Sequence, residues 1–297
     1  MEYVLYVLIG FIASVSGGFW GLGGGWMIVP ALLLLNVDIQ TVAAASLFQM
    51  AISSSWTVFR QFPGIGWKKG GWGWNVALPF CMASFIAGFS GEYVSSFMKE
   101  TFKSELPHQI IFFCILICIF ISIFKTKPAS PDLEKDQVGG ALMKSLIAST
   151  LGLFSGVISA VVGIGGGIIA RPVMTSILSV PEKTTGMITR LIVLFTGISG
   201  TTSYLYSGQV DRHDVVSIGL LLAMGGIPGF VIGAKMHESS LRSGTELAAQ
   251  RSFAIIVLLT MAGMICKVMD VVVLGRIIIS ISGVIICVFL GWISRKK

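Results

Sequence analysis

The sequence GLGGGWMIVP at residues 21–30 returns as GIGGGIIARP at residues 163–172, with the proline at the same distance from the last glycine. Both stretches lie in strongly apolar sequence. A glycine inside a helix costs about 1 kcal/mol relative to alanine, and lipid cannot hydrogen-bond the backbone groups that a break leaves free. Two costly breaks at matching points predict a site built by duplication.

The composition predicts a polytopic membrane protein with nearly all of the chain in the bilayer. Of its 297 residues, 54% are hydrophobic and 12% are charged, and the mean hydropathy is +0.87. A soluble domain carries about 25% charged residues. The net charge of +7 comes from Lys and Arg dispersed between apolar segments, which is typical of topology signals and excludes nucleic acid as the expected partner.

Apolar stretches long enough to span or nearly span a bilayer alternate with polar loops. The longer ones are Tyr3–Phe19, Val42–Phe59, Trp74–Tyr93, Gln109–Phe124, Leu142–Val162, Thr185–Tyr206, Val215–Met236, Phe253–Ile265 and Ile277–Ile293. A half-length stretch follows each glycine cluster, at Trp26–Asn36 and Ile168–Leu178. The sequence thus predicts an all-α polytopic membrane protein whose repeat unit has four longer helices and one short helix.

The predicted organisation has four parts. They are a first membrane repeat at 1–125, a cytoplasmic linker at 126–140, a second membrane repeat at 141–275, and an extra C-terminal helix with a basic tail at 276–297.

The orientation of the repeats depends on whether the short helices complete a crossing. If they do, the second repeat is inverted and most Lys and Arg residues face the cytoplasm; if they do not, these residues divide evenly between the two sides. The positive-inside rule favours the first arrangement, with the N-terminus outside and the C-terminus cytoplasmic. Inverted repeats with broken helices around a midplane site are a common plan of secondary transporters.

The glycine clusters are the candidate binding site. A helix that begins after a glycine loop directs free N–H groups and a partial positive charge at the loop, which suits an anion. The alternative is that the glycines only permit close helix packing. We expect the anion to lie between the two loops, with side chains from both repeats around it. The expected substrate-binding residues are Gly23, Gly24, Gly25, Gly165, Gly166, Gly167, Arg171, Arg190, Gln49 and Thr189.

Two arginines stand out in this set. Arg171 lies in an apolar run directly before Pro172, where the first repeat has Val29, and Arg190 lies one helical turn after Gly186. A guanidinium offers a planar fork of donors to an oxyanion. Each could instead lie at the membrane interface with its charge reaching water.

Other chemistry has weak support in the sequence. There is no HExxH motif, no Cys/His cluster with zinc spacing and no Walker A sequence, so we expect no metal, no cofactor and no catalytic residues. Intramembrane carboxylates are scarce, which disfavours coupling to protons or sodium. If such coupling exists, Glu92 is the candidate.

The paired glycine phrases, their trailing prolines and the turn GQVD at residues 208–211 resemble the TauE/SafE family of sulfite exporters and organosulfur-anion permeases. The resemblance covers residues 17 to about 270. It implies an inner-membrane transporter that moves small sulfur-containing oxyanions, such as sulfite or sulfonates, with the lipid bilayer as its other partner. The first repeat has GIGW at residues 64–67 in place of GQVD, so any role of Asp211 is not duplicated.

Several alternatives stay open at this stage. A passive anion channel would share the same site, and the substrate could be a small anion without sulfur. A membrane enzyme would need a nucleophile, an acid/base pair or a metal cluster at depth, and a structural or sensory protein would leave Arg171 unexplained. Rows of small residues could pack within the chain or between chains, so a homo-oligomer also stays open.

Overall fold

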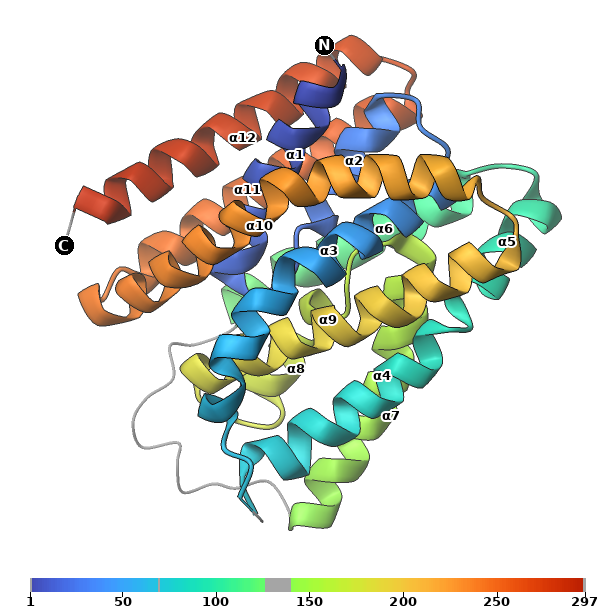
Figure 1. Cartoon of the computed structure of the whole chain (residues 1–297). Helices are drawn as coiled ribbons and strands as arrows, with labels where there is room; N and C mark the ends of the chain where they lie inside the picture. The colour runs from blue at the N-terminus through green and yellow to red at the C-terminus, as the bar shows by residue number, and fades with distance from the viewer. Residues whose placement is uncertain (1, 69, 126–139, 296–297) are drawn as a thin grey trace.

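The computed structural model describes residues 2–68, 70–125 and 140–295, and within these ranges the regular structure is entirely helical (Figure 1). The predicted linker at 126–140 lies outside the described residues except for Gly140. The helical fold class predicted from the composition is confirmed.

The helices follow the predicted order in each half. The first half contains α1 (Glu2–Trp20), α2 (Gly25–Leu34), α3 (Ile39–Gln61), the short turns η1 (Phe62–Ile65) and η2 (Gly73–Ala77), α4 (Leu78–Gly88), α5 (Gly91–Phe102) and α6 (Leu106–Lys125). The second half contains α7 (Ala141–Val162), α8 (Gly167–Ser176), α9 (Glu182–Ser207), α10 (Arg212–Ser243) and α11 (Glu246–Val268), and α12 (Val272–Arg295) follows it. The short helices α2 and α8 both begin at the last glycine of their cluster.

By length and composition, six helices in the described part of the chain could cross a membrane, or seven if one bent pair counts as a span. The bent pair is α4 and α5, which meet at an angle of 40°. The stretch Trp74–Tyr93, predicted to span or nearly span, is therefore not one continuous helix: it breaks between Gly88 and Gly91. Its counterpart in the second half, α10, is continuous over 32 residues.

The contacts between the two halves come in equivalent pairs: each contact has a counterpart in which the two halves trade roles. Helix α1 packs along α10, and its counterpart α7 packs along α4; α2 contacts α11, and α8 contacts α6. Helices α3 and α9 pack against each other between these groups. Small residues permit the close approaches: a Cβ atom at Gly225 would collide with the backbone of Val7, and one at Gly156 with that of Ser84. The orientation of one half relative to the other across the membrane stays a prediction.

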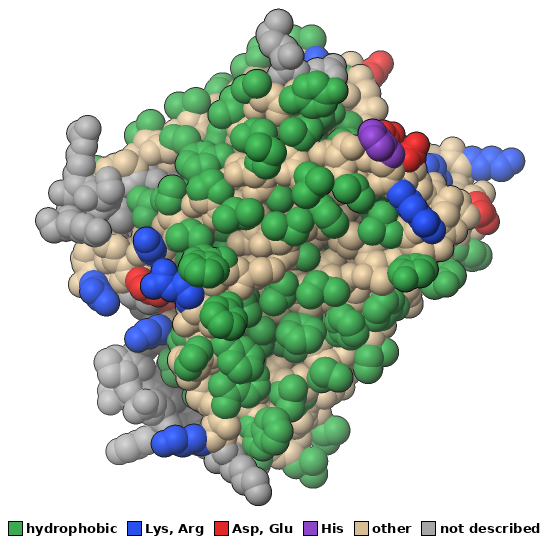
Figure 2. Space-filling view, in the orientation of Figure 1, with side chains coloured by type: hydrophobic (Ala, Val, Ile, Leu, Met, Phe, Trp, Pro, Cys, Tyr) green, Lys and Arg blue, Asp and Glu red, His purple; other side chains and the backbone are tan. Residues whose placement is uncertain are grey.

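The surface agrees with insertion in a bilayer. Figure 2 shows hydrophobic side chains covering the middle of one face, with charged side chains at two opposite edges. The left edge in this view carries mainly Lys and Arg, whereas the right edge carries both signs and a histidine. An apolar band between two charged edges is the arrangement that a bilayer requires.

Candidate functional site

The two glycine loops adopt the same backbone conformation. Left-handed φ values of +68° and +78° at Gly21 and Gly23 match values of +77° and +73° at Gly163 and Gly165. Glycine adopts this region without the steric cost that other residues pay. Gly24 and Gly166 then form the N-caps of α2 and α8, so each cluster turns the chain sharply into its short helix.

The loops contact each other directly. A Cβ atom at Gly25 would lie 2.5 Å from the carbonyl oxygen of Gly163, and one at Gly167 would lie 2.9 Å from that of Gly21. The contact is reciprocal, because each cluster meets the matching glycine of the other. All of these residues are buried.

The centre of this contact is filled by side chains from α3 and α9. Positions for a Cβ atom at Gly23 and Gly165 both lie within 3.6 Å of the Met50 sulfur and of a Val193 methyl group. The structure thus brings the predicted glycines together but leaves no room for a side chain between them.

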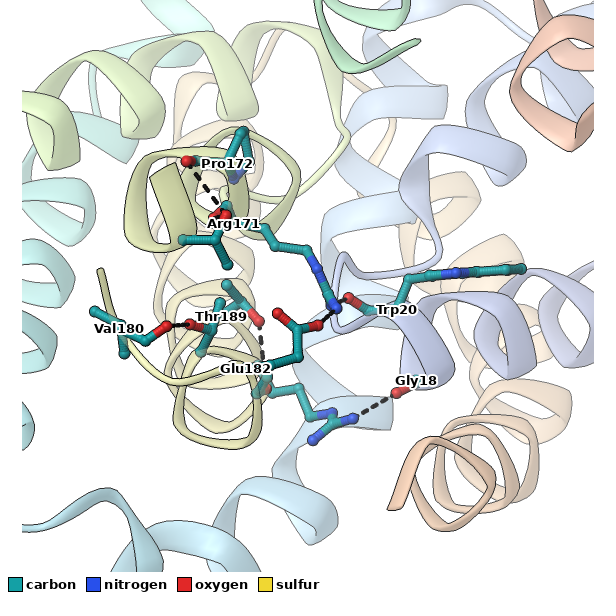
Figure 3. Close-up of polar contacts among 11 residues, drawn as sticks. Gly18, Trp20, Arg171, Pro172, Val180, Glu182 and Thr189 are labelled. Carbon is teal, nitrogen blue, oxygen red and sulfur yellow. Dashed lines mark hydrogen bonds and ion pairs between the residues drawn. The ribbon is translucent and has the colours of Figure 1, made fainter. Parts of the chain in front are cut away.

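Arg171 reaches the C-terminal end of α1 at Trp20 (Figure 3), and Arg190 reaches the same end at Gly18. Arg171, from α8, donates to the carbonyl oxygen of Trp20 and pairs with the carboxylate of Glu182. Arg190, from α9, donates to the carbonyl oxygen of Gly18 at 2.7 Å. The last carbonyls of a helix lack intrahelical partners and carry partial negative charge, which attracts cations.

The two arginines differ in access. The Arg171 side chain is 19% exposed and that of its partner Glu182 is 30% exposed, whereas Arg190 is 1% exposed. Arg190 also donates to Gln61 at 3.0 Å, while its Nε atom has no partner. Both guanidinium groups have partners in the protein. We call Arg171, whose side chain is partly exposed, the outer cation, and Arg190, which is buried, the inner cation.

Thr189 and Gly186 complete this side of the first glycine loop. A Cβ atom at Gly21 would lie 2.8 Å from the Thr189 hydroxyl and 3.5 Å from a terminal nitrogen of Arg171. A Cβ atom at Gly186 would lie 3.3 Å from Nε2 of His237 and 3.6 Å from Arg190. Donors from three helices therefore converge beside the loop, and we call Arg171, Thr189, Arg190 and His237 the cationic cluster.

Sequence reasoning missed two members of this neighbourhood. Glu182 is typical of a loop or helix-end carboxylate in the sequence and does lie at the first position of α9, but its pairing with Arg171 was not expected. His237 is 6% exposed, and its Nε2 atom has no hydrogen-bond partner. Its position between Lys235 and Glu238 gave no sign of burial, because only the packing of α10 turns it inward.

Gln49 stands apart from the cationic cluster. Its amide nitrogen donates to Ser14 at 2.6 Å and to Ser53 at 2.8 Å, while its carbonyl oxygen has no partner. The bond to Ser14 joins α3 to α1, and neither bond involves an arginine. Of the predicted side chains, Arg171, Thr189 and Arg190 are brought together and Gln49 is not.

Among the described residues, the backbone around the second loop is bound by hydroxyl groups and not by guanidinium groups. Val29, which matches Arg171, is completely buried. The hydroxyl of Ser46 donates to the carbonyl oxygen of Gly163 at 2.8 Å, and Tyr204 donates to that of Ala160 at 3.2 Å. Neutral hydroxyls thus bind the backbone at one loop, and guanidinium groups bind it at the other.

Comparison with known proteins gives a consistent result. The family model described as "Sulfite exporter TauE/SafE" matches residues 6–264. The chain is 25% identical over 261 residues to the "Probable membrane transporter protein YunE" of Bacillus subtilis, covering 81% of this chain and 92% of that protein.

Two further relatives carry similar descriptions. A "Probable membrane transporter protein" of Haemophilus influenzae is 29% identical over 217 residues, covering 69% of this chain and 74% of the relative. "Sulfite exporter TauE/SafE family protein 3" of Arabidopsis thaliana is 39% identical over 61 residues, which are 20% of this chain and 13% of that protein. No solved structure shows a significant match to the chain.

Proposed function

Because the chain belongs to the sulfite exporter TauE/SafE family of membrane transporters, we propose that it is a secondary transporter that exports small sulfur-containing oxyanions such as sulfite or organosulfonates. The observation that carries this proposal is the convergence of Arg171 and Arg190 beside the first glycine loop. A guanidinium fork matches two oxygens of a sulfite or sulfonate group.

The partners of the arginines suggest how an anion enters. Arg171 is partly exposed and paired with Glu182, so an anion competes with that carboxylate for the outer cation. Arg190 is buried behind it and binds the anion next, in exchange for the carbonyl of Gly18. Gly186 lies beside Arg190 and His237 with little room even for a Cβ atom, so the anion reaches the inner cation only as these side chains move aside.

The contact between the glycine loops suggests where the two halves move. Backbone packs against backbone where Gly25 meets Gly163 and Gly167 meets Gly21, with Met50 and Val193 at the centre, and this contact offers an interface that can part. Parting exposes the N–H groups at the starts of α2 and α8 to the anion. The proposed cycle is rocking of one half against the other around this contact, as in other transporters with repeats.

The proposed location is the inner (plasma) membrane, with the N-terminus outside and the C-terminus cytoplasmic. The surface supports this orientation, because the edge that carries mainly Lys and Arg in Figure 2 is the edge expected to face the cytoplasm. Export then begins with capture of the anion at this edge.

Flux in proteoliposomes tests the function. Purified protein is reconstituted, and entry of labelled sulfite and methanesulfonate is compared with that of acetate and with empty vesicles. We expect saturable flux of the sulfur oxyanions and acceleration by unlabelled anion on the opposite side, which a carrier shows and a channel does not. The substrate claim fails if neither sulfur oxyanion moves faster than in empty vesicles.

A further inference from the structure

A second buried polar cluster lies at the break between α4 and α5, and the proposed function does not use it. Glu92 is 1% exposed, and its carboxylate accepts a hydrogen bond from Ser96 at 2.7 Å. The ion pairs among the described residues are Lys99–Asp38 and Arg171–Glu182. Glu92 is thus a buried carboxylate with a hydroxyl partner and no counter-ion.

The burial of the Glu92 carboxylate without a counter-ion is energetically unfavourable. An isolated buried carboxylate is costly, and a proton is the smallest group that neutralises it. Ionisable residues within membrane proteins are rare and usually lie on substrate or proton pathways. No cationic side chain among the described residues forms an ion pair with this carboxylate.

The local backbone supports both charge states of Glu92. It lies in the first turn of α5, directly after the break at Gly88–Gly91. The partial positive charge of a helix N-terminus favours the carboxylate, whereas burial favours the neutral acid. A group that carries a proton during transport needs both forms to be accessible.

Neighbouring side chains extend the cluster across three helices. Ser95, one turn after Glu92, is hydrogen-bonded to Nε2 of His108 on α6 at 2.8 Å. Tyr204 on α9 lies near Ser95 and Glu92. Ser95, His108 and Tyr204 are completely buried, and Nδ1 of His108 has no partner. We call Glu92, Ser95, Ser96, His108 and Tyr204 the Glu92 cluster.

The charges around the cluster are few. Lys99 and Asp38, which pair at 2.5 Å, act on His108, and Glu92 and Asp38 act on Tyr204. Lys99 is occupied by Asp38 and also donates to Gln40 at 3.3 Å. The ion pair therefore leaves Glu92 as the uncompensated charge in this region.

We propose that the Glu92 cluster is the proton-binding site that couples anion transport to the pH gradient, with Glu92 as the proton carrier. Its coupling role rests on the proposed function. A proton adds no volume to side chains already in hydrogen-bond contact, whereas Na⁺ would need a cage of several oxygen ligands. The break between α4 and α5 gives the carrier a hinge that its counterpart α10 lacks.

The first test needs no substrate. Thermal unfolding of the full-length protein in detergent is followed from pH 5 to pH 8 for wild type, Glu92→Gln and Glu100→Gln. Glu100 is an exposed carboxylate on the same helix, so Glu100→Gln is the matched control. We expect the wild-type midpoint to fall by about 2–4 °C relative to Glu92→Gln as the pH rises, and Glu100→Gln to follow wild type. A constant difference between wild type and Glu92→Gln across this range overturns the proton site.

The second test measures coupling with methanesulfonate, whose charge does not change over this pH range. For one proton per anion, a one-unit pH difference supports about tenfold accumulation. We expect wild type and Glu100→Gln to accumulate the anion and Glu92→Gln to lose accumulation while it retains exchange of labelled for unlabelled anion. Accumulation by Glu92→Gln equal to wild type, or accumulation driven by Na⁺ at equal pH, contradicts the proposal.

The two tests separate the two proposals. If wild type moves no sulfur oxyanion, the proposed function fails, and the unfolding measurement still decides whether Glu92 exchanges a proton. If flux is present and independent of the pH gradient, the proposed function stands and the coupling inference fails.

Discussion

Gly18 of α1 and Ala160 of α7 occupy matching places three residues before their glycine loops, yet their carbonyl oxygens bind different donors. Gly18 accepts from the guanidinium of Arg190, and Ala160 accepts from the hydroxyl of Tyr204. The loops that follow have the same φ signs and contact each other through matching glycines. Backbone geometry is thus preserved between the halves while the charge around it is not.

The difference assigns separate tasks to the two loops. The first loop faces the cationic cluster, which suits an anion, and the Glu92 cluster lies near the end of α7, where Gly91 packs on Ala160. A duplicated backbone can position both groups of side chains symmetrically about the contact between the loops. The side chains around each loop then determine which ion binds there: an anion at the cationic cluster and a proton at the Glu92 cluster.

The largest expected effect is on folding. Gly163→Ala places a Cβ atom 2.5 Å from the backbone of Ala43 at φ +77°, so we expect a loss of about 2–5 kcal/mol from left-handed strain and overpacking. Gly21→Ala at φ +68° meets the movable Thr189 side chain and should cost about 1–2 kcal/mol. Thermal unfolding in detergent measures both.

Gly208→Ala is the control for strain without contact, because φ is +74° and no atom lies within 4 Å of the added Cβ. It should resemble Gly21→Ala. Equal losses for all three variants would mean that the tight contact of the second loop does not matter.

The next effect is on transport through the inner cation. Arg190→Gln removes the charge that holds Gly18 and should lower sulfite flux by about tenfold or more, since hydrogen bonds to charged groups contribute about 1.5–3 kcal/mol. Arg242→Gln, an exposed cation on α10, should leave flux within about twofold because surface charges contribute little. Comparable flux in the two variants, at equal amounts of folded protein, would remove Arg190 from the site.

A smaller effect separates the matching hydroxyls. Thr189→Val removes a neutral donor beside Arg171 and should reduce flux about two- to tenfold, the range of one hydrogen bond. Ser46→Ala, at the matching position of α3, loses a bond to Gly163 and should alter stability more than flux. If Ser46→Ala impairs flux as much as Thr189→Val, the two loops take part equally and the assignment of the anion to one loop is wrong.

The sequence alone predicted the parts of the fold that depend on local chemistry. The glycine clusters and prolines located α2 and α8, and apolar length located most of the long helices. The break before Gly91 was missed because the run Trp74–Tyr93 is mostly apolar, although Gly88 and Gly91 flank the bend. Hydropathy measures the environment of a segment and does not register a bend within it.

The site was predictable only in part for a similar reason. A charge in an apolar run marks Arg171 and Arg190 as residues that need partners, but the partners lie on α1 and at the start of α9. Gln49 has the same polar character and instead bonds to Ser14 and Ser53. Which polar residues share a site depends on how α1, α8 and α9 pack, and single-residue chemistry does not contain that information.

The most direct test of the anion site is the apparent affinity for sulfite of Arg171→Gln and Glu182→Gln in proteoliposomes. If an anion competes with Glu182 for Arg171, Arg171→Gln should raise the KM for sulfite and Glu182→Gln should lower it, each by about two- to fivefold, as expected for a partly exposed ion pair. A purely structural ion pair would make both variants change in the same direction. Opposite shifts support the cationic cluster as the anion site, and parallel shifts contradict it.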